Sequence, residues 1–145
     1  MSKVEDFLTQ EEEKKIIEAI KIAENNTSGE IRVHIEKNTV KLPMERALEV
    51  FHFLKMHKTQ LRNGVLIYIA VESKKFAILG DEGINAKVPE NFWESEKELM
   101  LKYFKKRAFA KGLELAIIEA GAKLKEFFPY LSNDTNELSD EISKG

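Results

Sequence analysis

The run of seven consecutive apolar residues at Val65–Val71 constrains the fold more than any other feature of this sequence. It is far shorter than the roughly 20 residues that a membrane-spanning helix needs. A strand that is apolar at every position is typical of a strand covered on both of its faces. Covering both faces requires a layer of helices on each side of the sheet. The run therefore predicts an α/β domain in which 65–71 is a central strand.

The segments that flank this strand predict how the sheet is connected. Residues 30–36 alternate between polar and apolar side chains, which indicates a strand with one buried face. A helical pattern over 43–54 separates the two strands, so they should pair in parallel through a right-handed crossover. The polar turn at 72–75 leads to a third strand at 76–79, which should pair antiparallel with 65–71. We therefore expect a Rossmann-like three-layer sandwich, with a mixed sheet of three to four strands covered by helices.

Three further helices are expected outside the sheet. Thr9 and Glu12 form a capping-box signature, which predicts a helix over 10–24. Pro89 suits the first position of a helix, because its missing N–H has no partner there in any case. The apolar periodicity of 108–128 predicts the last helix.

Length and composition indicate a single domain. The chain has 145 residues, of which 43% are apolar and 33% charged, as expected for one packed core with a charged surface. We assign residues 1–129 to one domain. Residues 130–145 are polar and acidic without periodicity, so they are expected to form a flexible tail.

Charge and cysteine content exclude several classes of function. The net charge is −2, from 23 basic and 25 acidic residues, which gives no general attraction for nucleic acid or anionic lipid. The basic cluster at 102–111 is interpreted as a solvated helix end, because its aromatic residues fall on the apolar stripe. The absence of cysteine excludes disulfides, thiolate metal sites and a thiol nucleophile. The N-terminus lacks the apolar segment of a signal peptide, so a cytoplasmic protein without a membrane span is expected.

Four motifs occur in order along the chain. They are Thr27-Ser-Gly-Glu-Ile-Arg-Val33, His57-Lys-Thr-Gln-Leu-Arg-Asn-Gly-Val-Leu66, Phe76-Ala-Ile-Leu-Gly-Asp-Glu-Gly-Ile84 and Val88-Pro-Glu-Asn-Phe-Trp93. They resemble, in the same order, the motifs of the TPM-domain family, the family of the thylakoid-lumen acid-phosphatase-like proteins. The similarity covers about Phe7 to Pro129.

The resemblance implies a Rossmann-like sandwich with a divalent-cation site, usually for Ca²⁺, at one edge of the sheet. It also implies the acid phosphatase activity attributed to plant members. One motif departs from the family pattern, since Arg107-Ala108 stand where relatives often carry a Gly-Asp or Gly-Glu pair.

The predicted topology gathers polar residues at one edge of the sheet. Glu30 and Asn63 precede the two parallel strands, and Asp81 and Glu82 follow the strand that the hairpin returns to that edge. Carboxylate and amide oxygens are the hard ligands that Ca²⁺ and Mg²⁺ take. Glu90, beside Pro89, is a further candidate ligand. The alternative interpretation is an ordinary turn with solvated acids.

Two more residues are expected at the edge of this site. His57 and Arg62 both precede the central strand, and Arg62 or Lys58 could hold a phosphate group. Asp81 could serve as a nucleophile or as a metal ligand for an activated water. No P-loop and no nucleophile paired with an activating base occurs in the sequence.

The leading hypothesis is a module that binds a divalent cation, Ca²⁺ or else Mg²⁺, and has no assigned cellular role. An unidentified protein partner is compatible with it. The alternative is a metal-dependent acid phosphatase that hydrolyses phosphomonoesters. A structural adaptor whose acidic edge binds nothing is the third hypothesis.

Overall fold

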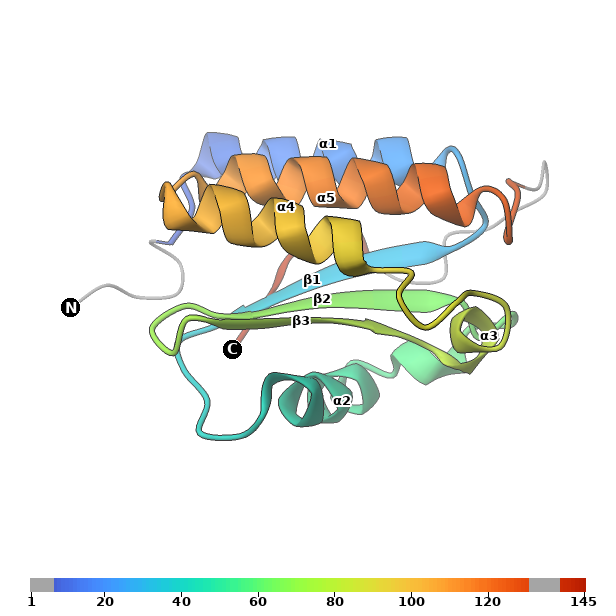
Figure 1. The fold of residues 1–145 in the computed structure, drawn as a ribbon, viewed down its shortest axis with the longest axis horizontal. Coiled ribbons are helices and arrows are strands. Elements are labelled where there is room, and N and C mark those ends of the chain that lie inside the picture. Colours follow the sequence, from blue (N-terminus) through green and yellow to red (C-terminus); the bar gives the residue numbers. More distant parts are fainter. Residues whose placement is uncertain (1–6, 131–138) are drawn as a thin grey trace.

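The computed structural model describes residues 7–130 and 139–145. One sheet separates two layers of helices, with α1, α4 and α5 on one face and α2 on the other (Figure 1). The elements in chain order are α1 (Gln10–Glu24), β1 (Glu30–Glu36), α2 (Pro43–Phe53), the 3₁₀ helix η2 (Met56–Lys58), β2 (Gly64–Ala70), β3 (Lys75–Gly80), α3 (Glu82–Asn85), α4 (Glu94–Lys105), α5 (Phe109–Leu124) and β4 (Ser143–Lys144).

The sheet has four strands in the order β3-β2-β1-β4. β1 and β2 are parallel, with Glu30 opposite Gly64 and Glu36 opposite Ala70. β2 and β3 form the antiparallel hairpin. The predicted α/β class, parallel pair and hairpin are therefore confirmed. Their physical basis is the long crossover through α2, which allows parallel pairing, and the short turn before β3, which does not.

Two apolar cores lie on opposite faces of the sheet. The larger core joins the apolar face of β1 to α1, α4 and α5, and the smaller one joins β2 and β3 to α2. All seven residues of β2 are buried, as the apolar run at 65–71 predicts. The larger core includes Ile16, Ile20, Ile31, Val33, Ile67, Met100, Leu113 and Ile117, and the smaller includes Val50, Phe51, Leu66 and Tyr68.

The helix expected at Pro89 begins later, at Glu94. Pro89 lies in a turn, where its carbonyl accepts a hydrogen bond from the N–H of Phe92 at 3.1 Å. The carbonyl of Phe92 is bound in turn by the ammonium of Lys123 on α5, so tertiary contacts set this helix start. No helix in the described ranges is long and apolar enough to span a lipid bilayer.

The end of the chain differs from the flexible tail that the sequence predicts. Ser143 and Lys144 form β4, which is parallel to β1. The N–H of Gly145 donates to the carbonyl of Ile35 at 2.9 Å, and the Ser143 hydroxyl lies 2.9 Å from Nδ1 of His34. Backbone groups on the outer edge of β1 need partners that a polar segment can supply, so hydropathy does not reveal this strand. Residues 131–138 of the expected tail lie outside the described residues.

Candidate functional site

Asp81 and Arg62 lie at the centre of the predicted site and are paired with each other. The Asp81 carboxylate caps the short helix α3 by accepting the N–H of Glu82 at 2.7 Å. Nε and Nη2 of Arg62 each lie 2.9 Å from a different oxygen of Asp81. A bidentate pair of this kind engages both carboxylate oxygens in charge-assisted hydrogen bonds. The guanidinium therefore occupies the position from which a cation would bind both oxygens of Asp81.

Gly83 explains how this loop packs against Arg62. The N–H of Gly83 donates to the carbonyl of Arg62 at 2.8 Å. A Cβ at position 83 would lie only 2.3 Å from the carbonyl oxygen of Leu61. Only glycine allows this approach without a backbone shift, so the Gly-Asp-Glu-Gly motif positions the Arg62–Asp81 pair.

Asn63 and Glu30 lie at the same sheet edge, where Asn63 makes structural contacts. The buried side-chain amide of Asn63 donates to the carbonyl of Ser28 at 3.0 Å. Its backbone carbonyl accepts the N–H of Glu30 at 3.2 Å. These bonds join the entries of β1 and β2, and they direct the Asn63 amide toward the backbone.

The other predicted site residues are more dispersed. Glu82 is exposed, with a carboxylate oxygen 3.5 Å from Nη1 of Arg62, and Glu90 is exposed in the turn before α4. His57 lies in η2, where its ring centroid is 4.9 Å from that of His52. Across residues 7–130 and 139–145, no three His, Asp or Glu side chains are grouped so that they could hold a metal ion. The structure thus brings Glu30, Arg62, Asn63, Asp81 and Glu82 to one edge without assembling a complete ligand sphere, and no contact joins Glu90 or His57 to them among the described residues.

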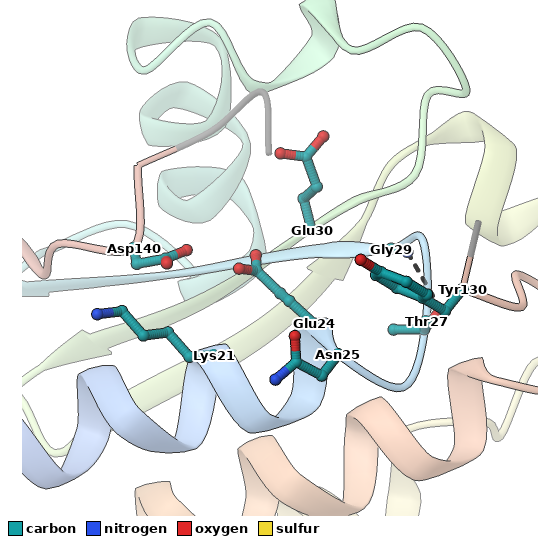
Figure 2. Close-up of a pocket in the computed structure, with 8 residues that line it drawn as sticks. All are labelled: Lys21, Glu24, Asn25, Thr27, Gly29, Glu30, Tyr130 and Asp140. Atoms are coloured by element: carbon teal, nitrogen blue, oxygen red, sulfur yellow. Dashed lines mark hydrogen bonds between the residues drawn. The ribbon is translucent and has the colours of Figure 1, made fainter. Parts of the chain in front are cut away.

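A second group of acids surrounds a pocket of about 350 Å³ beside β1. Glu24 comes from the end of α1, Asp140 from the segment before β4, and Glu30 from the start of β1. One carboxylate oxygen of Glu24 accepts the N–H of Ile31 at 3.1 Å. Figure 2 shows the carboxylates of Glu24 and Asp140 facing each other, while Glu30 points away from them.

The environment of Glu24 favours its protonated form. Burial, together with the hydrogen bond to Asp140, raises the pKa of Glu24 to about 9. The negative charges of Asp140 and Glu30 act in the same direction, and the N–H of Ile31 opposes them. At neutral pH the Glu24 carboxyl is therefore protonated and donates to its neighbour.

The sequence does not indicate Glu24 or Asp140 as candidate ligands. Glu24 is the last residue of a helix, and Asp140 lies in the segment that is expected to form a tail. The only relevant signal in the sequence is the acidic character of that segment, which does not specify a contact with residue 24.

The donors around the pocket suit a hard cation. Carboxylate oxygens are the ligands that Ca²⁺ and Mg²⁺ prefer. Asn25 also lines the pocket, and Lys21 contributes the one basic side chain among the lining residues. Thr27 is less suited, because its hydroxyl donates to the carbonyl of Phe128 and accepts the N–H of Gly29. In chemical type the donor set fits a divalent cation, with Glu30 having to turn toward the other two acids.

Comparisons with known proteins identify the family. The TPM domain profile matches residues 1–123, most of the chain. The chain belongs to the TPM domain family. Among solved structures, the TPM domain is similar to the BA42 protein from the psychrophilic bacterium Bizionia argentinensis, with 52% identity, full coverage of both chains and a TM-score of 0.92.

A more distant structure supports the fold alone. It is the N-terminal domain of a protein from P. gingivalis, with 14% identity, coverage of 84% of this chain and 79% of that one, and a TM-score of 0.70. A comparison of the TPM domain with curated proteins gave no match. No activity is transferred to the TPM domain by these similarities.

A buried polar network lies on the face of β1 that points away from the larger core of this TPM domain. The Glu36 carboxylate accepts hydrogen bonds from Nε and Nη2 of Arg46, both at 2.9 Å, and from the Tyr68 hydroxyl. Nε2 of His34 lies 3.1 Å from the same carboxylate, and Nδ1 contacts Ser143 of β4. The network therefore connects α2, β1, β2 and β4.

The Glu36 carboxylate at the centre of this network is strongly stabilised in its charged form. Burial acts to raise the pKa of Glu36, but hydrogen bonds from Arg46, Tyr68 and His34 outweigh it and lower the pKa to about 2. Burial, with the neighbouring Glu36, raises the pKa of Tyr68 well above its ordinary value. Burial lowers the pKa of His34, although Glu36 opposes this. The network is saturated with internal partners, so we assign it a structural role.

Proposed function

We propose that this TPM domain binds a divalent cation, with Ca²⁺ preferred over Mg²⁺, in the pocket lined by Glu24, Asp140 and Glu30. The observation that carries the proposal is that the carboxylates of Glu24 and Asp140, from two separate segments, face each other in one open pocket that Glu30 also lines. The sequence-predicted location at Asp81 is less favourable, because a cation there would have to displace Arg62.

The cation would replace the proton that Glu24 holds beside Asp140. Binding would leave both carboxylates charged and would neutralise their mutual repulsion. Glu30 would turn toward the ion as a third carboxylate ligand. Because these ligands come from a helix end, a strand start and an irregular segment, their geometry suits the flexible coordination of Ca²⁺ better than the near-ideal octahedron that Mg²⁺ requires.

The first test is the effect of Ca²⁺ on thermal unfolding. At a hundredfold excess over the dissociation constant, binding adds about 2.7 kcal/mol to the free energy of unfolding. For a chain of this size, that corresponds to a rise in Tm of roughly 5–10 °C. We expect Glu24→Gln and Asp140→Asn to abolish the rise, and Asp81→Asn to retain it, as measured by differential scanning calorimetry.

Two other results would contradict this proposal. If Asp81→Asn alone abolished the rise, the cation would bind at the edge predicted from the sequence. If millimolar Ca²⁺ changed neither the melting curve of the unsubstituted protein nor its heat of titration, cation binding itself would be rejected.

The second test is the pH dependence of stability without divalent cations. Unfolded Glu24 loses its proton near its ordinary pKa of 4.5, whereas folded Glu24 keeps it until about pH 9. Between these values the folded state binds more protons, so this group makes the free energy of unfolding fall as pH rises. Glu24→Gln cannot titrate, so its stability relative to the unsubstituted protein should increase from pH 5 to pH 9.

Urea denaturation at pH 5, 7 and 9 measures this difference. Glu18→Gln is the matched control, because it removes an exposed carboxyl from the same helix. An identical pH dependence for Glu24→Gln and the unsubstituted protein would show that Glu24 is not held protonated in the folded state.

A further inference from the structure

Six basic side chains at one end of the molecule have no acidic partner in the part of the chain that the structure describes. Five of them belong to residues 99–113, the end of α4 and the start of α5, where the sequence has no acid. The sixth lies in the turn between β2 and β3. All six are exposed, and together we call them the basic end: Lys74, Lys102, Lys105, Lys106, Arg107 and Lys111.

Aromatic contacts bring the three segments of the basic end together. The ring of Phe76, at the start of β3, lies edge-on to that of Phe104 on α4, with 5.6 Å between the ring centroids. Phe104 also contacts Phe109 of α5, with a centroid distance of 5.4 Å. Figure 1 shows the turn between β2 and β3, the end of α4 and the start of α5 at the same end of the molecule. The fold therefore collects these cations on one surface.

Several acids near the basic end are paired with other lysines, so they do not neutralise it. The pairs are Glu13 with Lys144, Glu49 with Lys41, and Glu72 with Lys37. Three exposed acids toward this end, Glu11, Glu45 and Glu98, offset at most three of the six positive charges. The basic end therefore keeps a net positive charge, although the whole chain carries a net charge of −2.

Exposed apolar side chains lie beside the basic end. Val40 is 100% exposed, and Leu42 and Leu101 are 65% and 48% exposed. The loop of Val40 is attached to the turn between β2 and β3, because the N–H of Thr39 donates to the Ser73 hydroxyl at 2.8 Å and that hydroxyl donates to the Thr39 carbonyl at 3.1 Å. Leu42 and Leu101 line one groove. An apolar loop tip thus stands next to the cations.

The combination of cations with exposed apolar side chains favours a lipid surface over nucleic acid. Acidic headgroups attract Lys and Arg, and the acyl boundary beneath them accepts apolar side chains. A nucleic-acid backbone would attract the same cations but would offer Val40 no apolar environment. The aromatic rings here are also unsuited to stacking on bases. Phe104 and Phe109 pack against each other, and two lysines of the basic end lie over the ring of Tyr103, at 5.6 and 5.8 Å.

We propose that the basic end of this TPM domain binds the surface of a bilayer that contains anionic phospholipid. The cations would contact the headgroups, and Val40 would enter the boundary between headgroups and acyl chains. The start of α1 lies near the basic end, since the rings of Phe7 and Phe109 are 4.7 Å apart, whereas Glu24 is the last residue of α1. The pocket beside Glu24 would therefore stay open to solution, and the proposal does not depend on cation binding there.

Vesicle flotation with the full chain tests the inference. The probes are vesicles of phosphatidylcholine and phosphatidylserine in equal amounts, and vesicles of phosphatidylcholine alone, both with a chelator that removes Ca²⁺. We expect binding to the first kind and not to the second, and binding should weaken as salt is added, because salt screens exposed charges. Equal binding to both kinds, or no binding to the anionic vesicles, would overturn the proposal.

Paired lysine substitutions locate the contact. Each Lys or Arg near an anionic surface strengthens binding by about fivefold. Combining Lys105→Ala with Lys106→Ala should therefore weaken binding about 25-fold. Combining Lys58→Ala with Lys125→Ala is the matched control, because it removes the same charge from exposed positions in η2 and after α5, away from the basic end. Equal losses from the two double variants would show that only net charge matters and would overturn the proposal.

A fluorescent label tests whether the loop tip enters the lipid. The chain has no cysteine, so Val40→Cys and Lys58→Cys each accept a single nitrobenzoxadiazole label. On anionic vesicles, the emission of the label at position 40 should increase and shift to the blue, and that at position 58 should not change. Equal responses at the two positions would exclude this orientation. Binding to duplex DNA, with no response at position 40 on vesicles, would assign the basic end to nucleic acid instead.

Discussion

Replacing Glu36 with alanine is expected to lower the free energy of unfolding by about 3–5 kcal/mol, the range for removing one partner of a buried ion pair. Glu36 is only 5% exposed and is the shared acceptor for Arg46, Tyr68 and His34. Its removal leaves the fully buried Tyr68 hydroxyl and the buried His34 ring without that acceptor. Urea denaturation measures the loss.

Glu49→Ala is the matched control for this prediction. Glu49 also accepts a hydrogen bond from Arg46, at 3.1 Å, but it is exposed to solvent. Exposed ion pairs contribute about 0.2–1 kcal/mol, so this variant should change stability by no more than that. A similar effect for both variants would mean that burial of the network does not determine its strength.

The pH dependence of the Glu36 contribution has a defined sign. The pKa of Glu36 is about 2 in the folded protein, below its ordinary value of 4.5. The stabilisation is therefore complete above pH 4.5 and is lost as the pH falls through 2. The difference in stability between the unsubstituted protein and Glu36→Ala should shrink over this window.

Replacing Ile117 with alanine is expected to lower the free energy of unfolding by about 2–5 kcal/mol. α5 packs against both α1 and α4, and Ile117 is completely buried in the larger core. Truncation removes apolar contact and leaves a cavity that the surrounding helices fill only in part. Calorimetry should show the corresponding fall in Tm, about 2–4 °C per kcal/mol for a chain of this size.

Ile118→Ala makes the same chemical change one residue later. Ile118 is 38% exposed, so its truncation leaves little cavity, and we expect a change within about 0.5 kcal/mol. Comparable losses at the two positions would show that α5 does not present the face described here to the core.

The strands whose side chains follow a regular pattern could be predicted from the sequence. The continuous apolar run of β2 predicts correctly that both of its faces are buried, which constrains the layers of the fold. The alternation of β1 predicts one buried face, which is wrong, because Glu30, His34 and Glu36 on its polar face are buried as well. The crossover and the short turn then determine which strands are parallel. The TPM motifs lie in these same segments, so the family and the fold could both be recognised without coordinates.

Only the tertiary structure shows which polar residues, far apart in the sequence, contact each other. The carboxylate of Asp81, a candidate ligand in the sequence, pairs with Arg62, and the acids that share a pocket include Glu24 and Asp140. β4 likewise depends on an edge of β1 that exists only after the sheet forms. A sequence pattern reports which apolar side chains leave water, because their burial follows the local period. It does not report which polar groups meet, because hydrogen bonds depend on distances that folding alone establishes.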